Sequence, residues 1–309
     1  MITVVDVLEN VDELDDPLFV VGCPRSGTTL LARAIGLSDY VCYVEETRLI
    51  PKYYTRQIAI SRAIQNWRKG DALAPYVKAK VRRVQDKLTG RDYLNDLIVH
   101  LIRYTKVDHH DLRPIAGHLV NRYDVKLAPQ DVELARKLYV KYRKMGRQDI
   151  DRMLRILFRD FQLLSGKSKI LEKTPTHAFY TNTLKRIFPG AKICFIARDG
   201  RDVAASYMLN HHERKSDKRT IRYICKTYRR IRSIDETLSN MNSPGYHRVE
   251  YEDLISRPAA VIEEVFDFFD LPFSGRVLDA LGEVERTPSN WQQLPERTRR
   301  YVEACLTTE

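Results

Sequence analysis

Long apolar runs are missing from this chain. A transmembrane helix needs about 20 consecutive, mostly apolar residues, and no stretch approaches that length. A basic segment followed by an apolar one, as in a secretory signal peptide, is missing too, because the first 17 residues hold six acidic residues and no Lys or Arg. We therefore expect a cytoplasmic protein without a membrane span.

Cysteine is scarce and scattered. The five cysteines are an odd number without close spacing, at Cys23, Cys42, Cys194, Cys225 and Cys305. Zinc sites use closely spaced Cys and His pairs, and small disulfide-rich domains use dense, even sets of cysteines. Neither pattern is present, so we expect reduced thiols and no metal site.

Internal repeats and low-complexity tracts are also absent. Aliphatic and aromatic residues are spread through all 309 positions, with 43% hydrophobic and 30% charged residues overall. That composition excludes a mostly disordered chain and is typical of an ordinary globular protein. The length suffices to bury a full core.

Short apolar segments alternate with helical patterns. Five such segments predict buried strands, at residues 17–21, 40–45, 169–173, 192–197 and 247–254. Helical spacing is found at residues 28–37, 202–209 and 216–240, and after Pro175 and Pro258. This alternation predicts an α/β fold whose central, mostly parallel sheet is covered on both faces. Residues 52–165 carry mostly helical patterns, with breaks near Gly70, Gly90, Pro114, Pro129 and Gly146. We expect one domain over residues 1–309, with this segment as a helical insertion.

Positive charge is concentrated in one part of the chain. Residues 48–107 contain 14 Lys or Arg and four Asp, within a chain whose formal net charge is +11. Two interpretations stay open: solvated helix faces, or a surface that attracts an anionic ligand or an acidic partner. Zinc-finger, RNP and homeodomain patterns are absent, so we do not expect nucleic-acid binding.

A phosphate-binding loop follows the first predicted strand and opens a helix. Its sequence is Gly22-Cys23-Pro24-Arg25-Ser26-Gly27-Thr28-Thr29. Two glycines separated by four residues match the spacing of the Walker loop. Backbone amides in such a loop converge on a phosphate, assisted by the positive end of the helix dipole. A plain strand-to-helix turn is the alternative.

This loop departs from the nucleotide-hydrolysing form in two respects. The Lys that normally follows the second glycine is replaced by Thr28, and the segment 192–197 is followed by Arg198 instead of ending in a magnesium-binding Asp. A cation is supplied inside the loop by Arg25. Backbone amides, two hydroxyls and one guanidinium suit a single 5′-phosphate that acts as the leaving group when a sulfur atom is attacked. Such a phosphate carries less charge than a β,γ-phosphate pair and needs no magnesium.

Two motifs together resemble a known family. The stretch PRSGTTLL resembles the 5′-phosphosulfate loop of sulfotransferases that use 3′-phosphoadenosine 5′-phosphosulfate (PAPS). The stretch ARDGRDVAAS, residues 197–206, resembles that family's 3′-phosphate motif, with Arg198 and Ser206 at the two binding positions. An Arg fork with a hydroxyl is a sound phosphate clamp, although Arg198 could instead pair with Asp199 or Asp202.

The resemblance implies a P-loop-type three-layer α/β fold. A third segment, YEDLISRPAAVIEEVFDFFDLP, matches the family's late strand-helix unit, where Tyr251 corresponds to a Tyr near the adenine; core packing is the alternative for Tyr251. The residues implied to bind the donor PAPS, or the product 3′-phosphoadenosine 5′-phosphate (PAP), are Arg25, Ser26, Gly27, Thr28, Thr29, Arg198, Ser206 and Tyr251.

The catalytic residues follow from further matches. Glu45-Glu46-Thr47-Arg48 with Ile50-Pro51 is similar to a stretch of protein-tyrosine sulfotransferases in which the first Glu is the general base, which corresponds to Glu45. His177 is the rival base, with a surface or packing residue in the first turn of a helix as its alternative. Glu45 could instead be a strand-end acid paired with Arg48. Lys173 and Arg25 are expected to stabilise charge on the leaving phosphate.

The acceptor is expected to differ from protein tyrosine. The third strand is followed by Lys173-Thr174-Pro175 rather than Lys-Asp-Pro, and the helical insertion is unfamiliar. Lys-Thr-Pro with His177 is more similar to bacterial members that act on small molecules, lipids or carrier-bound intermediates. We expect the insertion to form an acceptor lid and the acceptor to be anionic or carried by an acidic partner.

Other functions stay open at this stage. A P-loop kinase or nucleotidase lacks support because the loop Lys and the strand-end Asp are missing. A binding module without catalysis would retain the nucleotide site only. The segment 287–291 with Arg297, Arg299 and Arg300 lies where relatives fold a loop over the nucleotide, although a terminal helix with a basic face is the alternative.

Overall fold

The computed structural model describes residues 16–54, 93–105, 127–146, 148–210, 217–273, 277 and 290–307. Contacts divide these residues into two compact units: the described residues from 47 to 166 form one, and those before and after form the other. We call the first the helical unit and the second the sheet unit. None of the helices described is both long and apolar enough to cross a bilayer.

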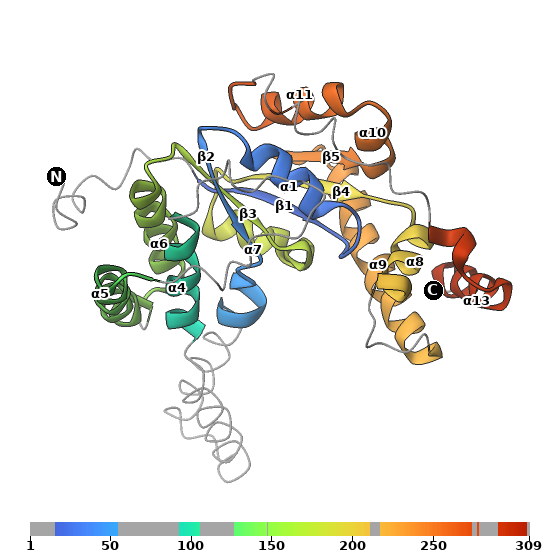
Figure 1. Cartoon of the computed structure of the whole chain (residues 1–309), viewed down its shortest axis with the longest axis horizontal. Coiled ribbons are helices and arrows are strands. Elements are labelled where there is room, and N and C mark those ends of the chain that lie inside the picture. Colours follow the sequence, from blue (N-terminus) through green and yellow to red (C-terminus); the bar gives the residue numbers. More distant parts are fainter. Residues whose placement is uncertain are drawn as a thin grey trace, which may run out of the picture. The chain divides into compact units, whose positions relative to one another are not determined.

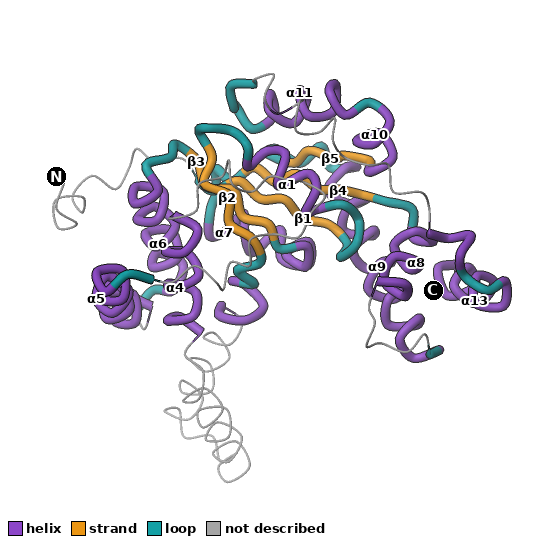
Figure 2. The backbone as a smooth tube through the Cα atoms, viewed as in Figure 1, coloured by secondary structure: helices purple, strands orange, loops and turns teal. Residues whose placement is uncertain are grey.

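The sheet unit is built on five strands that the described residues form. These are β1 (Leu18–Gly22), β2 (Val41–Glu45), β3 (Lys169–Lys173), β4 (Lys192–Ala197) and β5 (Tyr246–Glu250). Their order in the sheet is β2-β3-β1-β4-β5, and all four pairings are parallel. Figure 2 shows this single sheet with helices on either side of it. The predicted α/β fold with a central parallel sheet is confirmed.

Both faces of the sheet are covered, which explains the unbroken apolar sequence of the central strand. Leu18 and Val20 of β1 belong to a core with α1 (Thr28–Gly36) and α11 (Pro258–Phe268). Phe19, which points to the other face because side chains alternate along a strand, packs against the Phe188 ring at 5.8 Å. That second face is covered by η3 (Pro175–Tyr180), α7 (Thr181–Ile187) and α9 (Lys218–Asn240). A strand buried on both sides needs apolar residues at every position.

The last predicted strand is shorter than expected. The sequence predicts a strand over residues 247–254, but β5 ends at Glu250 and α10 (Tyr251–Ser256) begins immediately. Glu252 and Asp253 lie in the first turn of this helix, where negative charge is favoured by the helix dipole. Alternation in so short a segment does not distinguish strand from helix, and the correction places Tyr251 at a helix start beside the sheet edge.

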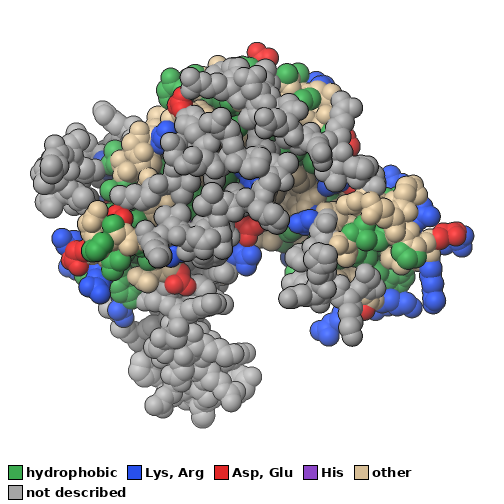
Figure 3. Space-filling model, viewed as in Figure 1, with side chains coloured by type: hydrophobic (Ala, Val, Ile, Leu, Met, Phe, Trp, Pro, Cys, Tyr) green, Lys and Arg blue, Asp and Glu red, His purple; other side chains and the backbone are tan. Residues whose placement is uncertain are grey.

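The C-terminal helical lobe consists of α8 (Gly200–Asn210), α9, η4 (Asn290–Gln293) and α13 (Glu296–Thr307). Its core is apolar and buried, formed by Ala204, Ala205, Met208, Ile221, Ile224, Cys225, Trp291, Leu294 and Val302. On the face shown in Figure 3, Lys and Arg side chains lie over this lobe. This core packs α8, which begins shortly after the end of β4, against α9, η4 and α13.

The helical unit contains η1 (Leu49–Tyr54), α4 (Tyr93–Thr105), α5 (Pro129–Gly146) and α6 (Ile150–Ser165). The predicted breaks at Pro129 and Gly146 are the two ends of α5, whereas Gly70, Gly90 and Pro114 lie outside the described residues. Lys141 and Tyr142 of α5 both donate to the Asp160 carboxylate of α6, at 2.5 and 2.6 Å.

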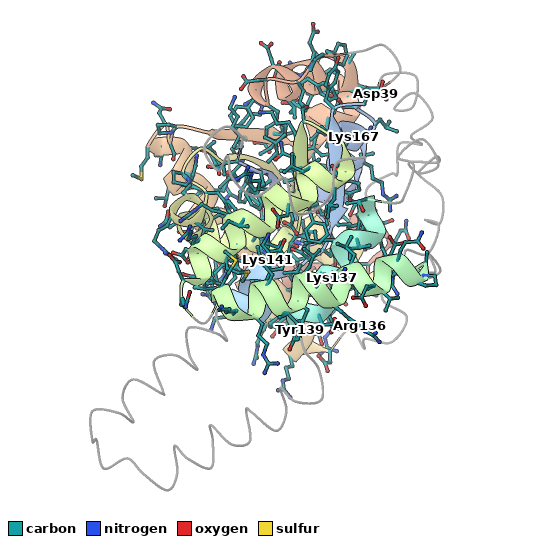
Figure 4. The ribbon with its side chains drawn as sticks, turned by 90° about the vertical axis from the view of Figure 1, so that its left-hand side faces the viewer. Asp39, Arg136, Lys137, Tyr139, Lys141 and Lys167 are labelled. Atoms are coloured by element: carbon teal, nitrogen blue, oxygen red, sulfur yellow. The ribbon has the colours of Figure 1, made fainter. Side chains whose placement is uncertain are left out.

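The outer face of α5 carries cations. Figure 4 shows Arg136 and Lys137 along this helix. Their side chains are 76% and 74% exposed, and each lies 4.0 Å from the exposed Glu133 carboxylate. Most of the basic segment 48–107 lies outside the described residues. The role of the helical unit as an acceptor lid therefore stays a prediction.

Candidate functional site

The strand order creates a switch point beside the first strand. From β1 the chain passes through α1 to β2 on one side of the sheet, and from β4 it passes through α8 and α9 to β5 on the other. β1 and β4 are neighbours, so the loops after them diverge at the carboxyl edge of the sheet. Open α/β sheets bind ligands at such a point. Arg198, which follows β4, contacts the Arg25 loop there.

The loop after β1 is tightly turned. The Ser26 amide and the Ser26 hydroxyl both donate to the Cys23 carbonyl, at 3.0 and 2.7 Å. Arg25 has a φ of 76° and Gly27 a φ of 94°, both in the left-handed region. The helix α1 then starts at Thr28, so the amides of its first turn have no partners within the helix. This arrangement presents free N–H groups to an anion, while the Ser26 hydroxyl proton is used to close the turn.

Gly27 packs directly beneath an aromatic ring. A Cβ at this position would lie 2.5 Å from Cδ2 of Tyr251 and 2.9 Å from its Cε2. The left-handed φ of 94° adds a second reason for glycine, because side chains rarely adopt it. The close approach fixes the loop against the start of α10.

Gly27→Ala is expected to lower the free energy of unfolding by about 2–4 kcal/mol, from backbone strain plus steric overlap. The matched control is Gly166→Ala: Gly166 also has a left-handed φ, of 65°, but apart from its chain neighbours no atom of the described residues lies within 4 Å of its Cβ position. That variant should lose only about 1 kcal/mol. Urea unfolding of both checks this, and equal losses would show that Tyr251 does not crowd Gly27.

Two arginines and a serine gather on the β4 side of the loop. Arg25 Nε donates to the Ser206 hydroxyl of α8 at 3.2 Å, and Arg198 Nη1 donates to the Arg25 carbonyl at 3.2 Å. The Arg198 guanidinium lies 4.1 Å from the centre of the Tyr251 ring. We call Arg25, Arg198 and Ser206 the arginine cluster. With Tyr251, the structure thus brings together four predicted site residues from three separate segments of the sequence.

The arginine cluster has the properties of an anion site. Burial, followed by the nearby Arg198 charge, lowers the pKa of Arg25, yet a guanidinium remains protonated at neutral pH. The Nε atom of Arg198 is buried and has no hydrogen-bond partner among the described residues. An unpaired buried donor beside two positive charges costs free energy unless an anion binds it, so these residues fit a phosphate group.

A second polar cluster lies on the other side of the loop. Glu45 and Lys173 are register partners at the ends of β2 and β3, and Lys173 Nζ donates to Glu45 Oε1 at 2.7 Å. The same Nζ donates to the Thr29 hydroxyl at 3.1 Å and lies 3.5 Å from Glu46 Oε1. Lys173 is fully buried, and Glu45 is 7% exposed. We call these four residues the lysine cluster.

His177 is not part of either cluster. It is fully buried, its Nδ1 lies 2.9 Å from Glu172 Oε2, and its ring meets the Phe19 ring edge-on with centroids 6.4 Å apart. Glu172 precedes Lys173 in β3, and successive strand residues point to opposite faces. His177 therefore lies beneath the face of the sheet opposite the lysine cluster.

Two residues of this region were not predicted from the sequence. Glu172 is a fully buried carboxylate that also accepts from the Thr174 hydroxyl at 2.6 Å. Tyr228 of α9 donates from its hydroxyl to the Arg198 carbonyl at 3.1 Å and so supports the arginine cluster. An acid within the apolar segment 169–173 was a usable signal for Glu172; nothing local indicated Tyr228.

Cys23, in the loop after β1, is buried. Burial, and secondarily Cys225, raises the pKa of the Cys23 thiol to about 12. A thiol rather than a thiolate is therefore present at neutral pH, and only the thiolate reacts readily.

The C-terminal segment is described only in part. Residues 287–289 lie outside the described residues, whereas Trp291 is buried against α8 in the core of the C-terminal lobe. Arg299 donates to the Gln292 side chain and Arg300 pairs with Glu296, both at 2.5 Å. The covering loop stays a prediction, and the described basic residues lie on or beside α13.

The chain is similar to proteins of one family. The profile of the sulfotransferase family matches residues 17–275. A putative protein-tyrosine sulfotransferase of Caenorhabditis elegans is 33% identical over 119 residues, 36% of this chain and 43% of that protein. An omega-hydroxy-beta-dihydromenaquinone-9 sulfotransferase of Mycobacterium tuberculosis is 23% identical over 279 residues, 83% of this chain and 63% of that protein.

A solved structure shares the fold. The sulfotransferase domain of the olefin synthase of Synechococcus PCC 7002 superposes with a TM-score of 0.51 at 15% identity, covering 97% of this chain and 91% of that one. The chain spans less than two thirds of the length of the curated relatives named above.

Proposed function

This chain belongs to the sulfotransferase family, and we propose that it transfers a sulfuryl group from PAPS to the hydroxyl of an acceptor, leaving PAP. One observation carries the proposal. The phosphate loop is flanked by the arginine cluster on the β4 side and by the lysine cluster on the β2–β3 side. PAPS carries a 3′-phosphate at one end and the transferable sulfuryl group at the other. The arginine cluster suits the 3′-phosphate, and the lysine cluster suits the sulfuryl end.

The donor would be held by groups that lie on both sides of the loop. The first-turn amides and hydroxyls of Thr28 and Thr29 suit its 5′-phosphate, while Arg198 and Ser206 suit its 3′-phosphate. Arg25 donates a hydrogen bond to Ser206 and is not part of the lysine cluster. We therefore propose that Arg25 contributes mainly to binding of the 3′-phosphate. Tyr251 carries the Arg198 guanidinium on its ring and would border the adenine.

Bound PAPS supplies an electrophilic sulfur and a phosphate leaving group. Glu45 would take the proton of the acceptor hydroxyl as its oxygen attacks in line. Lys173 would stabilise the negative charge that develops on the leaving phosphate oxygen, because its ammonium is buried and already oriented by Glu45 and Thr29. In this scheme Ser26 and Gly27 shape the loop that holds the leaving group.

The position of the two candidate bases favours Glu45 over His177. A general base must come within about 2.6–3.2 Å of the proton that it removes. Glu45 ends β2 at the carboxyl edge of the sheet, next to Lys173. His177 is enclosed under the opposite face, where a substrate hydroxyl has no access.

We propose a small-molecule, lipid or carrier-bound acceptor. The mycobacterial relative is named for a hydroxylated menaquinone, and the Synechococcus domain belongs to an olefin synthase. The helical unit would cover the acceptor. Its exposed cations on α5 fit an anionic acceptor or an acidic carrier.

PAP should bind to the protein at micromolar or lower concentration, and ATP with magnesium should bind weakly. Arg198→Ala is expected to weaken PAP binding by about 10- to 100-fold, through loss of charged hydrogen bonds. Binding of adenosine 5′-phosphate, which lacks the 3′-phosphate, should stay close to the wild-type value. Isothermal calorimetry with the three nucleotides checks this.

The matched control is Arg201→Ala. Arg201 lies three residues further on but pairs with Asp199 at 2.6 Å and is about half exposed, so its loss should leave PAP affinity unchanged. Stronger binding of ATP with magnesium than of PAP would contradict the proposal and favour a kinase.

A further inference from the structure

A buried polar network lies directly behind Lys173. The Glu172 carboxylate, fully buried, lies 2.6 Å from the Thr174 hydroxyl and 2.9 Å from His177 Nδ1. The Thr174 hydroxyl donates to Glu172 Oε1, and we assign Nδ1 of His177 as the donor to Oε2. The His177 amide also donates to the Thr174 carbonyl at 2.9 Å. One carboxylate thus ties together the end of β3 and the start of η3.

This network surrounds the backbone of the lysine on both sides. Glu172 precedes Lys173 and Thr174 follows it. The side chains of Glu172 and Thr174 are hydrogen-bonded to each other on the face of the sheet opposite the Lys173 ammonium. The Lys173 carbonyl accepts from the Glu46 amide at 2.6 Å, which ties the ends of β3 and β2. His177 and Glu172 therefore fix, from the opposite face of the sheet, the segment of main chain that orients Lys173 Nζ toward Glu45.

The packing around His177 supports a role that acts through Glu172. Its ring is fully buried and lies in a T-shaped arrangement with the Phe19 ring of the central strand, with centroids 6.4 Å apart. A fully buried Glu–His pair is costly unless its hydrogen bonds are satisfied. Apolar residues would fill this part of the core without that free-energy cost. The presence of the polar pair therefore indicates a role other than packing.

We propose that Glu172 and His177 are positioning residues for the sulfuryl transfer: they hold the end of β3 so that Lys173 Nζ stays against Glu45 and Thr29. His177 then contributes as a hydrogen-bond donor and does not take a proton from the acceptor. This inference rests on the proposed function. A displacement of about 1 Å at the reacting groups can reduce turnover by about 100-fold, so a residue on the far face of the sheet affects the reaction.

The experiment compares two substitutions of His177. In His177→Asn the side-chain amide can still donate to Glu172, whereas His177→Ala removes the donor. With PAPS and 2-naphthol as acceptor, His177→Ala should lower kcat by about 10- to 100-fold and leave the KM for both substrates nearly unchanged. His177→Asn should recover most of the lost kcat. Combining Glu172→Gln with His177→Ala should reduce kcat no further than the larger single effect, because both act through one contact.

A readout without turnover tests the same point. Acetic anhydride labelling of Lys173, followed by peptide mass spectrometry, should be several-fold faster in His177→Ala than in wild type and close to wild type in His177→Asn. Calorimetry with PAP and urea unfolding show whether each variant is folded. The matched control is His247→Asn, because His247 of β5 is half-buried and stacked on Phe268 at 5.1 Å; it should change neither kcat nor Lys173 labelling.

The possible results separate the roles. If Asn and Ala lose activity equally while Lys173 labelling stays at the wild-type rate, His177 is the base and the proposal is overturned. If His177→Ala keeps the wild-type kcat and labelling, the network is only structural and the proposal is likewise overturned. If wild-type protein binds no PAP, the proposed function fails, while faster Lys173 labelling in His177→Ala would still support the positioning contact.

Discussion

Glu45→Gln is expected to reduce kcat for sulfuryl transfer by about 10²- to 10⁴-fold. Glutamine has the same shape and keeps an oxygen that can accept from Lys173 Nζ, now 2.7 Å from Glu45 Oε1, but it cannot take a proton. The contacts of the lysine cluster should therefore survive while base catalysis is lost. Initial rates with PAPS and a panel of phenols, primary alcohols and a tyrosine peptide measure the effect, and PAP calorimetry should give an unchanged Kd.

Glu46→Gln is the matched control for that substitution. Glu46 is the adjacent residue and its carboxylate lies 3.5 Å from the same Nζ, but its side chain is 31% exposed. Its neutralisation should lower kcat by less than about tenfold. If Glu46→Gln is as inactive as Glu45→Gln, the roles of the two carboxylates have to be exchanged; if both keep near-normal turnover, another group is the base.

Lys173→Met should lower kcat by about 10²- to 10³-fold, because it removes the buried positive charge beside the leaving group. It should also lower the free energy of unfolding by on the order of 3 kcal/mol. Methionine fills a similar volume, so the loss of stability comes from the Glu45 carboxylate, which loses its 2.7 Å ion pair. Initial rates and urea unfolding measure the two effects.

A double substitution separates stability from catalysis. In Lys173→Met combined with Glu45→Gln, the buried carboxylate is neutral, so most of the lost stability should return. Activity should not return, because both the base and the buried cation are missing. Recovery of activity in the double variant would show that neither residue takes part in the transfer. Failure to recover stability would show that Lys173 is held chiefly by other contacts.

Much of the fold could be predicted from local patterns. Buried parallel strands read as continuous apolar segments, and four of the five predicted strands differ from the observed ones by no more than one residue at either end. Proline and glycine marked the ends of α5 correctly because each has a backbone preference that acts locally. β5 was predicted too long, since YEDL satisfies both a strand and a helix pattern until the tertiary structure decides.

The residues of the candidate site could be singled out from the sequence, but the contacts between them could not. Arg25 and Ser206 are separated by 181 residues, and Glu45 and Lys173 by 128. Sheet order and strand register bring each pair together, and both depend on packing between segments far apart in the chain. His177 shows the limit of motif reasoning, because its spacing from Lys173 does not reveal on which face of the sheet it lies.

The sequence by itself determined the α/β class, the glycine-rich loop after the first strand and the identity of the charged groups around it. These features depend on short-range properties: apolar runs, glycine at left-handed positions and an Arg-Ser pair placed on one strand-helix unit. Only the tertiary structure decided that the arginine and lysine clusters lie on opposite sides of the loop and that His177 is buried beneath Lys173. The physical reason is that side chains meet through sheet order, register and face, which packing of distant segments selects.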